Sequence, residues 1–198
     1  MQRIIIHWTA GSHTASAVDR EHYHFLVEGD GTEVLGQWPV AANAKIVGSN
    51  YAAHTLGTNT GSIGVAVCAM AGAKERPFSA GRFPITVTQL DALAALVGRL
   101  CAQYKIPVTR TTVLTHAEVQ PTLGIRQRGK WDIMWLPGMV AADDPIRVGN
   151  RIREMVMTSM TKPQWRPDVE PVDVMPATHD WLAALIAAIA AFFKGSRK

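Results

Sequence analysis

The chain opens with Arg3-Ile4-Ile5-Ile6-His7, and this segment constrains the possible folds more than any other. Three consecutive β-branched residues predict a buried strand, because such side chains fit a pleated surface that is covered on both faces. His7 is expected at the end of this strand, where a side chain can leave the packed sheet and face a cleft. A rigid strand that delivers an imidazole is suited to holding a metal ligand, but a single histidine after a strand is often structural.

Composition limits the chain to one sizeable core with a tail left over, since it has 198 residues of which 47% are hydrophobic. Its 20 Lys and Arg against 16 Asp and Glu give a formal net charge of +4. This excess is not gathered in a basic run, so it favours anionic partners in general, such as wall polymers or lipid headgroups, and nucleic acid is not expected. Cys68 and Cys101 are expected to be buried free thiols, with one disulfide as the alternative.

Beyond the first strand, predicted strands and helices interleave along the chain. Strands are expected over residues 23–27, 32–35, 62–69 and 113–116, and helices over residues 88–104 and 145–158. The spacing of Thr86 and Gln89 is that of a helix capping box. Long loops are expected over residues 36–61 and 117–131. This order predicts an α/β fold with a single mixed sheet flanked by helices.

The character of the chain changes after residue 160. Residues 161–178 contain four prolines and predict a linker between a first domain, residues 1–160, and an apolar C-terminal helix with a basic end, residues 179–198. Residues 181–193 have no polar side chain. At about 1.5 Å per residue they would extend roughly 20 Å, short of the roughly 30 Å hydrocarbon core of a bilayer. The helix is therefore expected either to dock on the first domain or to lie in a membrane surface.

Two histidines, His7 and His116, both end predicted strands, and neighbouring strands would bring their imidazoles together. Asp132 supplies a third, anionic ligand from a loop. Two histidines and one carboxylate leave a fourth zinc position open for water, which is the pattern of a catalytic site. Tyr23 could orient that water or accept a proton, and Lys130 could place an ammonium group over a developing oxyanion.

Five segments, taken in order, carry a family resemblance. They are IIIHWTA (residues 4–10), YHFLVEGDGTEV (23–34), AAHTLGTNTGSIGVAV (52–67), VLTHAEV (113–119) and GKWD (129–132). Together they resemble the zinc-dependent N-acetylmuramoyl-L-alanine amidases of the type 2 amidase family, which includes phage endolysins and is related to peptidoglycan recognition proteins. The resemblance covers roughly residues 3–158. It implies one zinc ion held by His7, His116 and Asp132, with Tyr23 and Lys130 as the catalytic tyrosine and lysine.

The chain departs from the family pattern at three places. Ala66 stands where many bacterial members have a catalytic glutamate, which favours the version of the mechanism that uses tyrosine and lysine. The connector before Tyr23 is short, so the helix normally found there is expected to shrink to a turn or two. The loop before Asp132 is long, which leaves Glu118 and Asp143 as alternative carboxylate ligands.

The resemblance implies hydrolysis of the amide bond between N-acetylmuramic acid and L-alanine in peptidoglycan, by a phage or prophage endolysin. A cytoplasmic muropeptide-recycling amidase and a non-catalytic muropeptide recognition module are the alternatives. Recognition proteins that have lost activity typically lack a zinc ligand, whereas all three are present here. His54 and Trp8 are the residues expected to touch the substrate, although a loop cap and a core position are the competing interpretations.

The expected place of action follows from the N-terminus. The first strand begins at residue 3, so no signal peptide is expected, and the protein would be made in the cytoplasm. It would reach the wall, in the periplasm, after the membrane is permeabilised. A monomer is expected.

Overall fold

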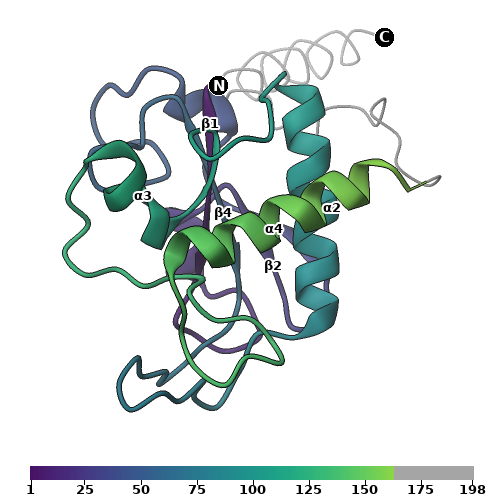
Figure 1. Ribbon diagram of the computed structural model, residues 1–198. Helices are drawn as coiled ribbons and strands as arrows, with labels where there is room; N and C mark the ends of the chain where they lie inside the picture. Colours follow the sequence, from purple (N-terminus) through teal and green to yellow (C-terminus); the bar gives the residue numbers. More distant parts are fainter. Residues whose placement is uncertain (163–198) are drawn as a thin grey trace, which may run out of the picture.

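The computed structural model describes residues 1–162, in which five strands form one mixed sheet (Figure 1). The strands are β1 (Arg3–Trp8), β2 (Phe25–Val27), β3 (Glu33–Leu35), β4 (Ser62–Val67) and β5 (Val113–Thr115). Their order in the sheet is β3-β2-β4-β1-β5. β1 pairs in parallel with β4 and β5, β2 pairs in parallel with β4, and only β3 runs antiparallel to its neighbour. The predicted α/β fold with a single mixed sheet is confirmed.

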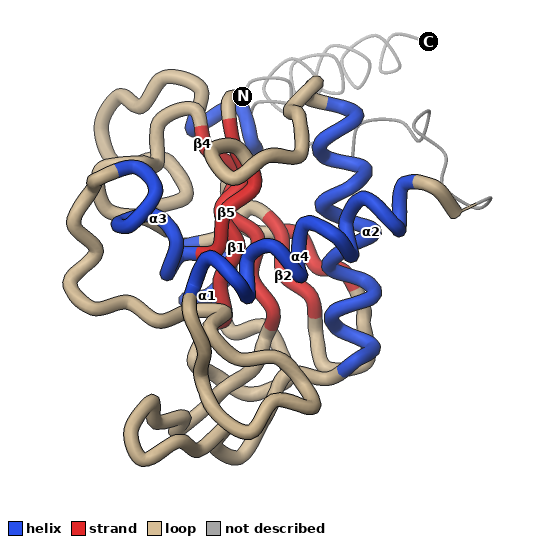
Figure 2. The backbone as a smooth tube through the Cα atoms, viewed as in Figure 1, coloured by secondary structure: helices blue, strands red, loops and turns tan. Residues whose placement is uncertain are grey.

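The helices are α1 (Ala17–His22), η1, a 3₁₀ helix (Val40–Asn43), α2 (Val87–Gln103), α3 (His116–Leu123) and α4 (Pro145–Met160). Long loops connect many of these elements (Figure 2). The capping box expected at the start of α2 is present, since the Thr86 hydroxyl accepts from the Gln89 backbone and the Gln89 side chain accepts from the Thr86 backbone. α1 has six residues, so the shortened helix expected before Tyr23 is also confirmed.

Two element boundaries differ from the sequence prediction near the first histidine. His7 lies within β1 rather than after its end, because β1 continues to Trp8 alongside β4. Tyr23 is the C-terminal cap of α1 and does not open β2, which begins at Phe25. The side chains of His7 and Tyr23 are therefore held by a strand and by a helix end, respectively.

A larger difference concerns residues 117–131, which are not a continuous loop. α3 begins directly after β5, so His116 is the first residue of a helix rather than the last of a strand. The overlooked signal is a second capping box, in which Thr115 caps the helix and Glu118 completes the box. The polar, glycine-containing sequence favours a loop, but Gly124 in fact ends α3 in a left-handed conformation with φ of 72°.

The two faces of the sheet are buried in different ways. Consecutive residues of a strand point to opposite faces, so Ile6 and Trp8 lie on one face and His7 on the other. Ile6 and Trp8 belong to the hydrophobic core shared with α2 and α4, which pack against each other (Figure 1); we call this the helix face. The opposite face, with His7 of β1 and the small residues Gly64 and Ala66 of β4 beside it, we call the histidine face.

The two cysteines confirm the favoured sequence interpretation. Cys68 and Cys101 are buried and unpaired. Burial raises the pKa of each thiol to about 12. Neither thiol is therefore suited to act as a nucleophile or a metal ligand.

The C-terminal predictions fall almost wholly outside the described residues. Of the linker predicted for residues 161–178, only residues 161 and 162 are described, and the helix predicted for residues 179–198 is not. Within residues 1–162, none of the helices combines the length and the apolar character needed to cross a bilayer.

Candidate metal centre

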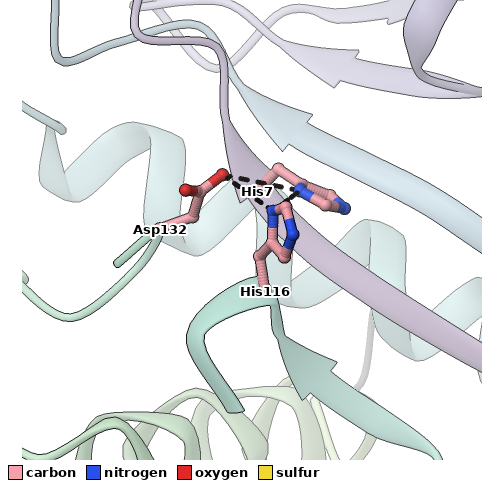
Figure 3. A group of neighbouring side chains, drawn as sticks. All are labelled: His7, His116 and Asp132. Carbon is pink, nitrogen blue, oxygen red and sulfur yellow. Dashed lines mark hydrogen bonds and ion pairs between the residues drawn. The ribbon is translucent and has the colours of Figure 1, made fainter. Parts of the chain in front are cut away.

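Three side chains from distant parts of the chain converge on the histidine face (Figure 3). His7 comes from β1, His116 from the junction of β5 and α3, and Asp132 from the loop between α3 and α4. The two Nδ1 atoms lie 3.0 Å apart. Oδ2 of Asp132 lies 3.5 Å from Nδ1 of His7 and 3.3 Å from Nδ1 of His116. The structure thus brings together the three residues that the sequence predicts as ligands.

These three atoms fit around a single metal ion. In a tetrahedral site with bonds of about 2.0–2.1 Å, two ligand atoms are separated by roughly 3.3–3.4 Å. The observed separations of 3.0, 3.3 and 3.5 Å lie close to that value on either side. Three protein ligands leave one coordination position for water or substrate, as in catalytic rather than structural sites.

The protonation states also suit a cation. Burial lowers the pKa of His7 to about 4, although Asp132 acts in the opposite direction, so this imidazole is neutral near pH 7. Burial raises the pKa of the Asp132 carboxyl, but its close contacts with the imidazoles of His116 and His7 outweigh this effect and hold the pKa well below its usual range. A neutral imidazole and an ionised carboxylate are the forms that bind metal.

The outward-facing nitrogen of each imidazole has a buried partner. Nε2 of His116 lies 3.0 Å from Oε1 of Gln127. Nε2 of His7 lies 3.2 Å from the Thr55 hydroxyl and 3.3 Å from Nδ1 of His54. Partners of this kind orient metal-binding histidines and raise their basicity. Sequence analysis missed Gln127 and Thr55, because amide and hydroxyl side chains in loops are usually exposed and no spacing rule marks them.

His54 lies behind His7, buried among other rings. Its imidazole is edge-to-face with that of His7, with ring centroids 5.3 Å apart. A Cβ atom at Gly64 would lie only 2.5 Å from the His54 ring, so the glycine in β4 lets this ring approach the sheet. The structure therefore gives His54 a supporting contact with a candidate ligand, and its predicted contact with substrate stays a prediction.

Trp8 occupies a core position. Its side chain is on the helix face, and the residue is 5% exposed. Its ring packs edge-to-face on Trp131, with centroids 4.6 Å apart. The competing interpretation from sequence, a core position, describes this environment, and little of the ring is available for the substrate contact predicted for Trp8.

Tyr23 and Lys130, the predicted catalytic pair, both lie near the three candidate ligands. The Tyr23 ring centroid is 5.1 Å from that of His7. Burial, reinforced by the charge of Asp132, raises the pKa of the Tyr23 phenol far above its usual value, so the hydroxyl keeps its proton. Lys130 is exposed, and its positive charge is close enough to contribute to lowering the pKa of His7.

The two alternative carboxylates are engaged elsewhere. Glu118 is fully buried and pairs with Arg153 of α4 at 2.8 Å, while its other oxygen accepts from the Thr115 backbone at 2.9 Å. Asp143 forms an exposed ion pair with Arg147. Neither of them belongs to the group that converges here, and Asp132 is the carboxylate that lies with His7 and His116.

Comparisons with known proteins agree with the sequence resemblance. The model of the family described as N-acetylmuramoyl-L-alanine amidase matches residues 1–137. Similar solved structures include N-acetylmuramoyl-L-alanine amidase LysC from Clostridium intestinale URNW, at 18% identity over 76% of this chain and 84% of that chain, with a TM-score of 0.45. The Ph2119 endolysin from Thermus scotoductus MAT2119 bacteriophage Ph2119 is similar at 17% identity over 78% of this chain and 84% of that one, with a TM-score of 0.44. No curated protein sequence matches.

A third similar structure is longer than the region it shares with this chain. It is the amidase AmiD from E. coli in complex with the substrate anhydro-N-acetylmuramic acid-L-Ala-D-gamma-Glu-L-Lys, with 22% identity and a TM-score of 0.41. The match covers 59% of this chain and 48% of that one, so this chain spans about half of its length.

Proposed function

Because the chain belongs to the N-acetylmuramoyl-L-alanine amidase family, we propose that it is a zinc-dependent enzyme that cleaves the amide bond between N-acetylmuramic acid and L-alanine in peptidoglycan. The observation that carries this proposal is the convergence of His7, His116 and Asp132, whose ligand atoms all lie within 4.8 Å of one another. A recognition module that only binds muropeptides has no need for such a set of metal-binding side chains.

The donor set suits zinc in particular. Imidazole nitrogen and carboxylate oxygen are common zinc ligands, and the arrangement of two histidines and one carboxylate recurs in zinc hydrolases. When bound, zinc lowers the pKa of a coordinated water to about 7 and polarises a carbonyl group as a Lewis acid.

The chain's own residues supply the remaining requirements. The ammonium group of Lys130, two residues before Asp132, can stabilise negative charge that develops on the carbonyl oxygen of the scissile amide. The protonated phenol of Tyr23 can donate a hydrogen bond to the reacting group and help to pass a proton to the leaving amine of L-alanine. Ala66 offers no carboxylate, so a general base at that position is not available and Tyr23 and Lys130 carry the proposed roles.

We also propose that the protein is a phage or prophage endolysin, which reaches the wall once the membrane is permeabilised. The family resemblance in the sequence supports this role, and the net charge of +4 suits an anionic wall polymer. A recycling amidase would prefer soluble muropeptides. Comparing cleavage of intact sacculi with cleavage of soluble muropeptides separates the two roles, and faster cleavage of sacculi is expected.

The activity itself is tested by product analysis. Purified peptidoglycan is incubated with the protein, with a chelator, and with the chelator followed by excess zinc. The expected products are stem peptides with a free L-alanine amino terminus, formed without new reducing sugar ends, lost with the chelator and restored by zinc. Bound but uncleaved peptidoglycan in the presence of zinc would favour the recognition module, and cleavage that is indifferent to the chelator would refute the zinc dependence.

A further inference from the structure

Gln127 is a buried amide directly behind one of the candidate ligands. The residue is 4% exposed although it lies in the loop between α3 and Asp132. Its Oε1 lies 3.0 Å from Nε2 of His116. Its Nε2 donates to the backbone carbonyls of Leu56, at 2.9 Å, and Ile125, at 3.3 Å.

These contacts determine which way the amide faces. A backbone carbonyl can only accept a hydrogen bond, so the two carbonyls require the nitrogen of the Gln127 amide on their side. The amide oxygen must then face His116, and because that oxygen is only an acceptor, Nε2 of the imidazole must carry the hydrogen. In a neutral imidazole this leaves the lone pair on Nδ1. Nδ1 is the atom that lies 3.0 Å from His7 and 3.3 Å from Asp132.

We propose that Gln127 is a positioning residue, which holds His116 in the tautomer and orientation that present Nδ1 to the metal. This inference rests on the proposed function, since it assigns a role toward the zinc ion. His7 differs in this respect. Its Nε2 faces a hydroxyl and a second imidazole, Thr55 and His54, and each of these groups can either donate or accept. On the His116 side, two backbone carbonyls fix the orientation of the Gln127 amide and with it the direction of the hydrogen bond.

The same residue also joins the segments that surround His116. The backbone N–H of Gln127 donates to the side-chain Oε1 of Gln120, a residue of α3, at 2.9 Å. The side chain reaches Leu56, which is 71 residues away in the loop between β3 and β4. A tether of this kind is a purely structural role, and the test must separate it from the acceptor role toward His116.

Three variants make that separation. Gln127→Met keeps the length of the side chain but has no acceptor for His116, Gln127→Glu keeps the acceptor but loses the donor to Leu56, and Gln120→Met loosens the loop without touching the histidine. Zinc affinity is measured on the metal-stripped proteins by competition with a chromophoric chelator. Nitrogen NMR of the metal-free proteins at alkaline pH reports the tautomer of His116, whose signals are identified by their loss in His116→Ala.

We expect Gln127→Met to bind zinc about 10- to 100-fold more weakly, the usual effect of losing an outer partner of a ligand, and to show a mixture of His116 tautomers. Gln127→Glu and Gln120→Met should stay close to wild type in affinity and keep the hydrogen on Nε2. If Gln127→Met fails to fold, the NMR spectra of the wild type and Gln127→Glu still test the proposal, because both must show the His116 hydrogen on Nε2.

The outcomes distinguish this inference from the proposed function. Unchanged zinc affinity and an unchanged tautomer in Gln127→Met, in a background where the wild type binds zinc and cleaves the wall, overturn the positioning role and leave the function intact. Equal losses in all three variants also overturn it, since the tether alone would then explain the effect. A wild-type protein that binds no zinc overturns both.

Discussion

The two faces of the sheet bury neighbouring residues of the same strand in opposite environments. On the helix face, Ile6 and Trp8 pack in an apolar core with α2 and α4. On the histidine face, His7 is just as deeply buried, but its neighbours are two other histidines, a hydroxyl group and a carboxylate. One residue step along β1 therefore separates hydrophobic packing from a cluster of polar groups.

This contrast shows how stability and chemistry are divided in the fold. Apolar burial stabilises at about 25 cal/mol per Å², whereas a buried polar group is destabilising unless it finds a partner. On the histidine face, the ring nitrogens of His7 and His116 have such partners, or point to the shared centre where a metal would bind. Substitutions on the helix face should therefore change stability alone, and those on the histidine face should change metal binding.

The largest effect is expected at the carboxylate of the candidate centre. Asp132→Asn removes the charge and the ligand with almost no change in shape, so peptidoglycan hydrolysis should fall to the level without enzyme, and zinc should be lost on dialysis. Released L-alanine amino termini and metal content measure the two effects. Asp143→Asn, at the exposed alternative carboxylate, is the control and should keep full activity. If Asp132→Asn stayed active, Asp132 would not be a ligand.

The buried ion pair between α3 and α4 is expected to have the next largest effect. Glu118 of α3 and Arg153 of α4 are both buried, and Gly149 makes room for the carboxylate, since a Cβ there would lie 2.0 Å from it. Glu118→Gln leaves the Arg153 charge unpaired, and the free energy of unfolding should fall by about 3–5 kcal/mol. Denaturant titration measures this loss.

The control for that prediction is the exposed pair of Asp143 and Arg147. Asp143→Asn should leave the denaturation midpoint nearly unchanged, because exposed ion pairs contribute little. An equally small effect in Glu118→Gln would mean that the buried pair does not hold α3, and with it His116, against α4.

A smaller loss of stability, without any change in zinc affinity, is expected for a substitution in α2 on the helix face. Leu96 is 1% exposed in the apolar core, so Leu96→Ala should lower the free energy of unfolding by about 2–5 kcal/mol. Val87→Ala, at an exposed position of the same helix, is the matched control and should change stability little. Zinc affinity of the folded Leu96→Ala protein should equal that of wild type, and a clear loss of affinity would break the proposed separation of the two faces.

The smallest predicted effect concerns pH. Burial lowers the pKa of His24 to about 4, and its Nδ1 accepts from the Gly64 backbone at 2.9 Å. In the unfolded chain, His24 becomes protonated near pH 6.5, but in the folded protein it does so only near pH 4. The contribution of His24 to stability is therefore fully present above pH 6.5 and is lost as the pH falls toward 4. His7 contributes in the same direction.

Replacing His24 isolates its share of this dependence. In the presence of a chelator, His24→Gln should lose less stability than wild type between pH 7 and pH 5, by on the order of 2 kcal/mol. Urea unfolding at the two pH values measures it. Equal losses in the two proteins would show that His24 is not held neutral by burial.

The parts of the fold that could be predicted from sequence are those with local signals. The isoleucines of β1 and the capping box of α2 depend on residues close together in the chain. α3 has such a signal too, in Thr115 and Glu118, but the polar, glycine-containing sequence of this segment favoured a loop.

The residues of the candidate site likewise divide into those that the sequence predicts and those that it does not. His7 and His116 follow from strand patterns. Asp132 is a loop carboxylate that no periodicity marks, so its assignment depends on the family resemblance for support. Gln127 could not be predicted, since its role depends on the approach of a loop 71 residues away, which only tertiary packing brings about.

The most direct test of the shared metal centre is a calorimetric titration of zinc into the metal-stripped protein. We predict one zinc ion per chain in wild type, and loss of this binding in each of His7→Ala, His116→Ala and Asp132→Asn. A wild type that takes up no zinc, or a stoichiometric site that survives all three substitutions, would contradict the account.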